Sequence, residues 1–96
     1  MSKKVILEFK VEKNNVEALM KFLDNNLSNV RNFDGCSQVE VYYNSQEEKM
    51  IFDEMWESVE HHQNYLSFIT QNGVMTELAS FLSSPPEIKY FDLLNL

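Results

Sequence analysis

The residue types with the most chemical reactivity gather in one stretch of the chain, Phe52–His62. It contains the only tryptophan, Trp56, both histidines, His61 and His62, and three glutamates. Imidazole and carboxylate groups transfer protons near neutral pH, and a neighbouring aromatic ring offers a stacking surface to a flat organic molecule. The hydrophobic pattern predicts that a strand passes into a helix within this stretch. Because side chains at such a junction can converge where a sheet opens, we expect any active or binding site here.

The helix after this junction is predicted to begin at Ser58, a residue type that caps helix N-termini well. Its inward stripe at helical spacing consists of Val59, His62, Leu66 and Ile69. His62 is therefore expected to face the sheet, where its imidazole could act as a general base or as an ordinary hydrogen-bonded core histidine. His61 lies about 100° further round the helix, so we expect it to be partly exposed.

Three further side chains near the junction each allow two interpretations. Trp56 could form a wall for ring stacking, with its indole N–H donating to a substrate oxygen, or could simply pack in the core. Tyr65 could be a second donor at the pocket mouth or an ordinary surface tyrosine. Glu54 alternates with Phe52 and Trp56 and so shares their apolar face. A carboxylate there needs a partner, for which Arg31 or a lysine could serve, and we interpret this pair as structural.

A shared metal ion at the start of this helix is the remaining chemical possibility. Glu57 and His61 are four residues apart and could hold one cation together. The adjacent histidines, His61 and His62, diverge around a helix and cannot both bind one ion. The sequence offers no obvious third ligand, so we expect no metal.

The rest of the chain provides the elements that position this junction. Asn14 and Glu17 are spaced as a capping box for the first helix. The predicted elements are a strand at Val5–Val11, a helix at about Asn15–Arg31, a turn at Phe33–Cys36, strands at Ser37–Asn44 and Lys49–Glu57, a helix from Ser58 that Asn72–Gly73 interrupts, a short helix at Val74–Leu82, and a last strand at Glu87–Leu94 after Pro85–Pro86. This order predicts one α+β domain over residues 3–95 with a ferredoxin-like βαββαβ antiparallel sheet and helices on one face.

One face of the predicted sheet has nothing to cover it. The third and fourth strands are apolar on both sides, with Ile51 and Met55 opposite Phe52 and Trp56 and with Phe91 on the last strand. An antiparallel sheet wetted on one side would alternate more cleanly. A chain of 96 residues also has a thin stability margin by itself. A second copy could cover the bare face, so we expect a homodimer.

Composition and charge narrow the partners and the location. The net charge is −7 and the lysines form no basic face, which argues against nucleic acids. Cys36 is the only cysteine, so no disulfide can form within the chain, which fits a reducing compartment. Glu8 interrupts the apolar run at the N-terminus before it reaches the length of a signal peptide or a membrane span. We expect a soluble, cytoplasmic protein that does not bind membranes.

The chain resembles the antibiotic biosynthesis monooxygenase domain family of dimeric α+β barrel proteins over nearly its whole length. The sharpest feature is Glu54-x-Trp56-x-Ser58 at the end of a strand. The other matching features are Arg31, Gly35-Cys36, Glu57, His62-Gln63, Leu66 and Pro85-Pro86. The resemblance implies cofactor-independent oxygenation of electron-rich aromatics such as quinols or anthrones. Relatives with this fold instead degrade haem, or isomerise or rearrange small molecules.

The resemblance also suggests roles for particular residues. Histidine is the natural base for removing a phenolic proton, which makes His62 or His61 the candidate. We expect His62 to be the base or proton holder, with Trp56 and Tyr65 as further catalytic candidates. The expected substrate contacts are Phe52, Trp56, Leu66 and Phe9. Quinone-forming members often carry asparagine at the position of Phe52, and many relatives carry histidine at that of Tyr65. Haem-degrading relatives need a histidine where this chain has Leu66, so we do not expect haem degradation.

Three functions follow from these residues. The first is a cofactor-independent monooxygenase that acts on a small quinol-like or anthrone-like aromatic in an apolar cavity of a homodimeric barrel. The second is a non-catalytic domain of the same fold that binds a small hydrophobic ligand, which Phe52 favours. The third is an isomerase-like transfer of protons, which needs a base but no oxygen.

Overall fold

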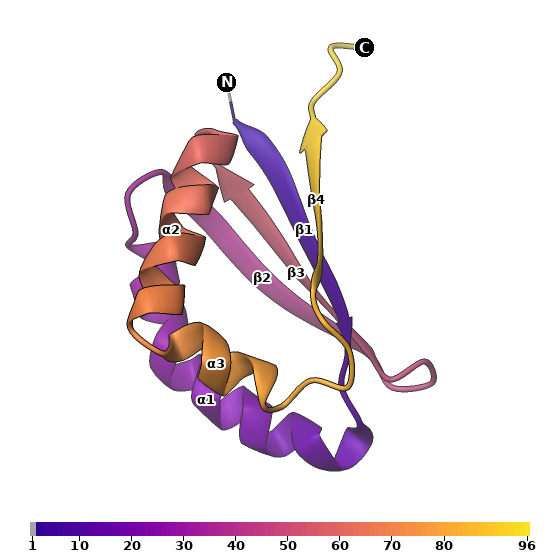
Figure 1. Ribbon diagram of the computed structural model, residues 1–96. Coiled ribbons are helices and arrows are strands. Elements are labelled where there is room, and N and C mark those ends of the chain that lie inside the picture. Colours follow the sequence, from indigo (N-terminus) through magenta and orange to yellow (C-terminus); the bar gives the residue numbers. More distant parts are fainter. Residues whose placement is uncertain (1) are drawn as a thin grey trace.

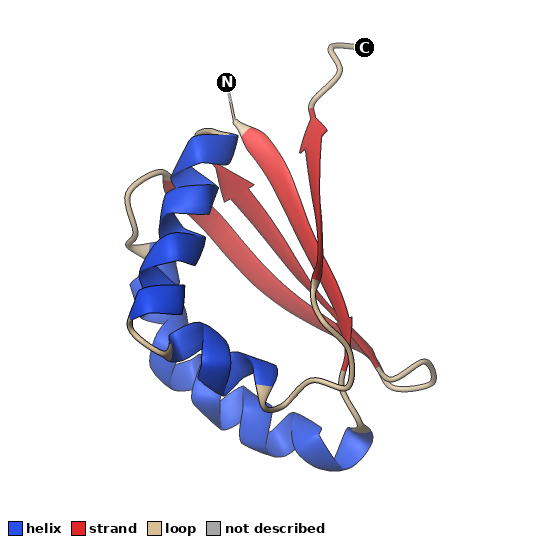
Figure 2. Ribbon diagram, viewed as in Figure 1, coloured by secondary structure: helices blue, strands red, loops and turns tan. Residues whose placement is uncertain are grey.

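The computed structural model describes residues 2–96, which form one open antiparallel sheet with helices on one of its faces. The elements in chain order are β1 (Lys3–Lys10), α1 (Lys13–Arg31), β2 (Cys36–Asn44), β3 (Lys49–Trp56), α2 (Val59–Gln71), α3 (Val74–Ala79) and β4 (Glu87–Asp92). The strand order is β2-β3-β1-β4, and Figures 1 and 2 show the three helices on the same side of the sheet. The predicted ferredoxin-like α+β fold is confirmed, and the sheet of a single chain is not closed into a barrel.

The pairing of the central strands determines which side chains face the helices. Leu7 on β1 lies opposite Phe52 on β3, and Val5 lies opposite Glu54. Because side chains alternate along a strand, these positions share the helix-covered face with Phe9. All five side chains are buried. The register therefore carries Glu54 into the apolar core together with its neighbours.

The first helix begins in a way that the sequence did not predict. Its N-cap is Glu12, whose side chain makes no capping hydrogen bond, so the predicted capping box of Asn14 and Glu17 is wrong. Instead, the backbone N–H of Lys13 donates to a carboxylate oxygen of Glu48, at 2.8 Å. An acceptor from the turn between β2 and β3 thus replaces the local cap.

Two predicted elements end at least two residues earlier than expected. Helix α3 stops at Ala79 and not at Leu82, and the chain continues in tighter turns of i to i−3 hydrogen bonds. Strand β4 stops at Asp92 because its partner strand begins at Lys3, which lies opposite it. Leu94, the predicted end of this strand, is exposed. The end of β4 is therefore determined by where its partner strand begins.

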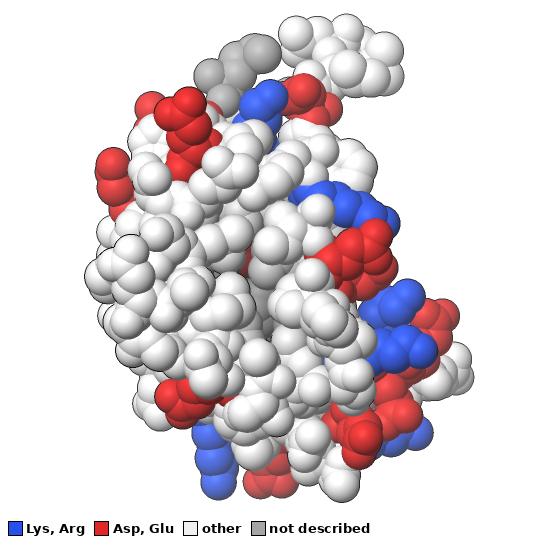
Figure 3. Space-filling model, viewed as in Figure 1, with Lys and Arg blue, Asp and Glu red and all other residues white. Residues whose placement is uncertain are grey.

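The face of the sheet that the helices leave bare is mixed in character. Its side chains include the half-buried Met55 and the exposed Phe91. Between the apolar side chains, Lys4 pairs with Asp53 at 2.7 Å. Figure 3 shows lysine and acidic side chains interleaved along the side where the sheet lies, whereas the surface over α2 and α3 is mostly uncharged. Among residues 2–96, no helix is long and apolar enough to span a membrane.

A tight turn joins α1 to β2 and packs against the start of α2. Gly35 has a φ of 91°, and its carbonyl accepts a hydrogen bond from the backbone N–H of Glu57 at 2.7 Å. A Cβ atom at Gly35 would overlap the imidazole of His61. The position therefore requires glycine both for its left-handed backbone and for the close approach of α2.

We expect Gly35→Ala to lower the free energy of unfolding by about 3 kcal/mol, through left-handed strain and the overlap with His61. Gly73→Ala is the matched control, because Gly73 has a φ of 88° but a Cβ atom there would meet nothing within 4 Å. Gly73→Ala should lower the free energy of unfolding by about 1 kcal/mol, through backbone strain alone. Urea unfolding followed by tryptophan fluorescence measures both, and equal losses in the two variants would contradict the packing role of Gly35.

Candidate active site

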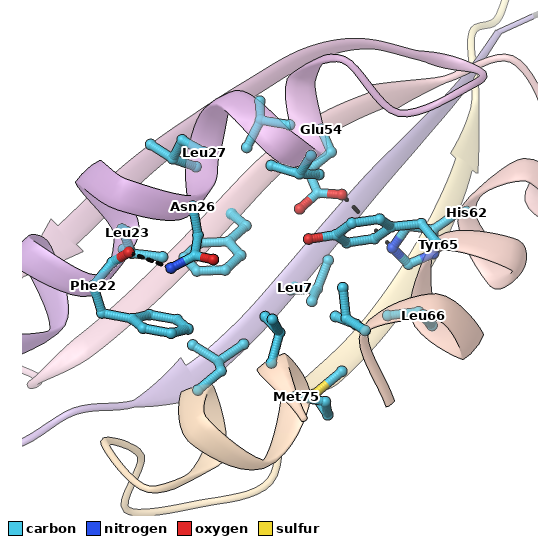
Figure 4. A pocket seen from close by; sticks show the side chains of 16 residues that line it. Leu7, Phe22, Leu23, Asn26, Leu27, Glu54, His62, Tyr65, Leu66 and Met75 are labelled. Carbon is cyan, nitrogen blue, oxygen red and sulfur yellow. Dashed lines mark hydrogen bonds and ion pairs between the residues drawn. The ribbon is translucent and has the colours of Figure 1, made fainter. Parts of the chain in front are cut away.

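A small cavity lies between the sheet and the three helices (Figure 4). Its volume is about 40 Å³. Its walls are mostly apolar, with contributions from the sheet, α1 and α3 that include Leu7, Phe52, Leu23, Leu27, Met75 and Leu78. Four polar side chains also line it, namely Glu54, His62, Tyr65 and Asn26. Any chemistry in this cavity depends on these four groups.

Glu54 is the most unusual of the four, because its side chain is charged yet the residue is only 3% exposed. Its Oε1 accepts a hydrogen bond from the indole N–H of Trp56, at 2.8 Å. The two residues alternate on β3, so strand geometry alone directs the donor to the acceptor. Neither the second oxygen of Glu54 nor the hydroxyl of Tyr65 has a hydrogen-bond partner among the described residues. Because no fully buried polar side-chain atom in residues 2–96 is unpaired, both atoms are reached by open space, and both residues line the cavity.

His62 links this carboxyl to the last strand. The residue is 1% exposed, and its Nδ1 lies 2.8 Å from the hydroxyl of Tyr90 on β4. Its Nε2 lies 3.6 Å from Oε1 of Glu54. A carboxyl oxygen so near favours the tautomer that carries hydrogen on Nε2, so we assign the hydroxyl of Tyr90 as the donor to Nδ1. The Nε2–H group is then available at the polar end of the cavity.

Burial shifts the proton affinities of Glu54 and His62 in opposite directions. Burial raises the pKa of Glu54 to about 7, the repulsion of Asp53 adds to this rise, and the hydrogen bond from Trp56 opposes it. Burial lowers the pKa of His62 to about 4. The sequence predicted His62 as the group that titrates near working pH, whereas in the structure that group is Glu54. Near neutral pH the imidazole is neutral and can donate from Nε2.

Tyr65 adds a second neutral donor at the same end of the cavity. Burial, together with the nearby Glu54, raises the pKa of Tyr65 to about 12, so its hydroxyl keeps its proton. The ring packs edge-on against Phe33 with centroids 5.1 Å apart. In Figure 4 the carboxyl of Glu54, the ring of His62 and the hydroxyl of Tyr65 lie together at one end of the cavity. One proton acceptor and two donors therefore converge there.

The residues expected at the site divide into two groups. His62, Tyr65, Phe52 and Leu66 line the cavity. Trp56 does not, because its fully buried ring lies behind the polar groups, with centroids 5.3 Å from His62 and 5.6 Å from Tyr65. The expected stacking wall of Trp56 is thus replaced by core packing and the hydrogen bond to the carboxyl.

Phe9 also lies behind the cavity and not in its wall. Its ring meets that of Phe52 edge-on with centroids 5.0 Å apart, so it supports a lining residue from the far side. Sequence reasoning did not select Asn26, which lines the cavity from α1. The sequence analysis also assigned Glu54 a structural role, although a carboxylate on an apolar strand face could have indicated a functional residue.

The ionic partner expected for Glu54 is absent at that position. Arg31 instead donates from Nε and a terminal nitrogen to the carbonyl of Val39, at 3.2 and 2.8 Å. This leaves the carboxyl with hydrogen bonding from Trp56 and no cation in contact among the described residues. The absence of a compensating positive charge is why burial can raise the pKa of Glu54 so far.

His61 is partly exposed, as predicted, and belongs to the surface. Its Nδ1 lies 2.7 Å from the hydroxyl of the N-cap Ser58. Its Nε2 lies 3.7 Å from a carboxylate oxygen of Glu57 and 3.8 Å from one of Asp34. Within residues 2–96, no group of three histidine, cysteine or acidic side chains is arranged to hold a metal ion.

An open four-stranded antiparallel sheet with helices on one face and a cavity between the layers defines a ferredoxin-like α+β protein. Residues 4–67 match the model of the family described as "Antibiotic biosynthesis monooxygenase". The chain therefore belongs to that family, which confirms the resemblance noted from its sequence. The match ends within α2, so α3 and β4 lie beyond it.

Solved structures share this fold at low sequence identity. Rv0793 from Mycobacterium tuberculosis superposes with a TM-score of 0.81 at 18% identity, covering 100% of this chain and 98% of that one. A monooxygenase from the gene ActVA-Orf6 of Streptomyces coelicolor, in complex with the ligand nanaomycin D, gives 0.81 at 14% identity over 99% and 89%. A conserved protein from Methanosarcina mazei Go1 gives 0.82 at 16% identity over 95% and 91%. No functionally curated protein matches the sequence.

Glu54 should give the free energy of unfolding a measurable pH dependence. Its pKa rises from 4.5 to about 7 on folding, so its stabilising contribution is complete below pH 4.5 and is lost as the pH rises through 7. The shift corresponds to roughly 3 kcal/mol. Between pH 4.5 and 8 we expect the wild type to lose about this much stability relative to Glu54→Gln, whose amide oxygen still accepts the indole hydrogen bond. Urea unfolding at a series of pH values measures the difference.

Glu57→Gln is the control for this titration, because Glu57 is an exposed carboxylate at the end of the same strand. Its stability curve should run parallel to that of the wild type. His62 contributes in the opposite direction, since its lowered pKa costs stability as the pH falls from 6.5 to about 4. That contribution is shared by the wild type and both variants. Parallel curves for Glu54→Gln and the wild type would show that Glu54 does not carry the shift.

Proposed function

We propose that this protein is a cofactor-independent monooxygenase whose substrate is a small electron-rich aromatic, quinol-like or anthrone-like, bound in the cavity of a homodimer. The observation that carries the proposal is the convergence of Glu54, His62 and Tyr65 at one end of an apolar cavity. Membership of the monooxygenase family supports the reaction class. The low identity to the solved relatives leaves the substrate to be argued from the cavity itself.

The first step is removal of a proton from the substrate by the carboxylate of Glu54. A base works best when its pKa lies near the operating pH, and Glu54 meets that condition. The negative charge that develops on the substrate oxygen is stabilised by the Nε2–H of His62 and the hydroxyl of Tyr65. The apolar walls exclude water and so strengthen these hydrogen bonds.

The electrons for oxygen reduction come from the substrate anion. With a quinol-like substrate, a 1,4-naphthoquinol and O₂ become a 2-hydroxy-1,4-naphthoquinone and water. With an anthrone-like substrate, a CH₂ group and O₂ become a carbonyl group and water. Atoms and electrons balance in both reactions without another reductant. The proton held by Glu54 returns to the reduced oxygen as water forms. The protein's part is to bind the ring, remove the proton and hold the resulting anion.

Entry of an aromatic ring requires the cavity to enlarge. A volume of about 40 Å³ accommodates about three water molecules, whereas a cavity of about 150 Å³ is needed for benzene. Helix α3 is the wall best able to move, since its packing partner is chiefly α2 and Gly73 at its start has open space around it. We infer that α3 shifts outward when substrate binds.

The expected homodimer supplies cover for the bare face of the sheet. Ile51 and Met55 lie on that face, and Phe91 is exposed there. Their burial against a second copy would add to the core of a small chain. The charge pairs between them then lie within or around the interface.

Sedimentation equilibrium tests the dimer. We expect a particle of twice the 11.3 kDa chain mass at micromolar concentration, and we expect Ile51→Asp to shift it towards the single chain by burying an unpaired charge. Met20→Asp is the control, because Met20 is an exposed apolar residue on α1 and so lies in the helix layer, not on the bare face of the sheet. A wild-type particle of one chain mass at these concentrations would overturn the dimer.

Oxygen consumption with a panel of naphthoquinols and anthrones tests the reaction. We expect Glu54→Gln to reduce the rate roughly 100-fold or more, through loss of the general base. His62→Ala and Tyr65→Phe should reduce it less, since each removes one of two donors. Glu57→Gln, the exposed control, should retain the wild-type rate. An unchanged rate in Glu54→Gln would remove Glu54 from the mechanism.

A non-catalytic role in holding a small hydrophobic ligand is the alternative, and the predominantly apolar lining that includes Phe52 favours it. Native mass spectrometry of freshly purified protein would then show a retained compound. Retention of a compound without any oxygen consumption across the panel would favour this role over catalysis.

A further inference from the structure

One polar side chain of the cavity has no part in the proton transfer proposed above. Asn26 lines the cavity from α1, apart from Glu54, His62 and Tyr65. In Figure 4 its amide and the hydroxyl of Tyr65 point toward one another from opposite walls. The intervening walls are apolar. The cavity therefore has hydrogen-bonding groups at both ends.

The position of Asn26 on its helix makes it conspicuous. The buried residues of α1 are Leu19, Leu23 and Val30. Asn26 continues this stripe, three residues after Leu23 and four before Val30. Helical spacing predicts an apolar residue there, and asparagine is also a poorer helix former than leucine or alanine. Asn26 is half-buried, so its amide lies between this buried stripe and the surface.

The amide of Asn26 uses only part of its hydrogen-bonding capacity within the protein. Its Nδ2 donates to the backbone carbonyl of Phe22 at 2.8 Å, which fixes the orientation of the amide. Its Oδ1 has no partner among the described residues. An oriented amide at the edge of an apolar cavity can therefore accept a hydrogen bond from a ligand, and its second N–H can donate one.

We propose that Asn26 is a substrate-binding residue, and that the cavity takes a ring carrying an oxygen at each of two opposite ends. One oxygen lies among Glu54, His62 and Tyr65, and the other hydrogen-bonds to Asn26. This deepens the proposed function and rests on it. It selects 1,4-dioxygenated rings, the quinol type, over anthrone-type molecules with a single oxygen.

Binding of two stable, isosteric ketones tests the proposal without any turnover. The compounds are 4-hydroxy-1-tetralone, which has oxygen at both ends, and 4-methyl-1-tetralone, which has a methyl group in place of the hydroxyl. We expect the wild type to bind the hydroxy compound about three- to tenfold more tightly, the value of one hydrogen bond. Calorimetry measures the affinities, and the NMR signal of the single indole N–H, from Trp56, reports occupancy beside the cavity.

Asn26→Leu should reverse the preference, so that the methyl compound binds more tightly, while total ligand binding persists. Asn25→Leu is a matched control, since Asn25 is the adjacent asparagine on the exposed side of α1. It should leave the wild-type preference unchanged. The inference is overturned if the wild type shows no preference, if Asn26→Leu keeps it, or if the wild type binds neither ketone. Failure of the proposed oxygenation is separate, because it would appear as ligand binding without oxygen consumption.

Discussion

The burial of one carboxyl group without a cation is the constraint on which the site depends. The pairing of β1 with β3 places Glu54 on the helix-covered face, opposite Val5. The hydrogen bond it receives there comes from Trp56, two residues further along the same strand. A neutral indole donor offsets less of the cost of burying a charge than an arginine or lysine would. The carboxyl therefore keeps an affinity for protons near neutral pH, which gives the cavity a group that can exchange a proton in that range.

Local patterns predicted the fold because the residues of each helix and strand show its hydrophobic periodicity or its cap. The alternation of Val5, Leu7 and Phe9 indicated the central strand, and Ser58 indicated the start of α2, where its hydroxyl accepts from the N–H of His61 as a cap should. The wrong predictions concern the ends of helices and strands that a residue distant in the sequence determines. Glu48, across the sheet hairpin, determines the start of α1.

The location of the site was also predictable, but the roles of its residues were not. Spacing placed His62 inward, and the structure confirms that it lines the cavity. Spacing could not reveal that Arg31 turns to the carbonyl of Val39 and leaves Glu54 without a cation. The raised pKa of Glu54 follows from burial without a cation, and the lowered pKa of His62 follows from burial. Asn26 was not predicted as a site residue because only the apolar residues of α1 were expected to face inward. A polar residue on the inward stripe was itself an indication of a binding site.

The family match includes the polar groups of the site but not every residue that supports them. The family match covers residues 4–67, which include Glu54, Trp56 and His62. The hydroxyl of Tyr90 on β4 lies 2.8 Å from Nδ1 of His62, and Met75 and Leu78 on α3 form part of the cavity wall. Both lie beyond the match. Because the tautomer decides whether the imidazole donates or accepts in the cavity, two proteins with the same carboxyl and imidazole can differ in reaction through this last third of the fold. In this protein, α3 and β4 therefore contribute to the site together with the residues inside the match.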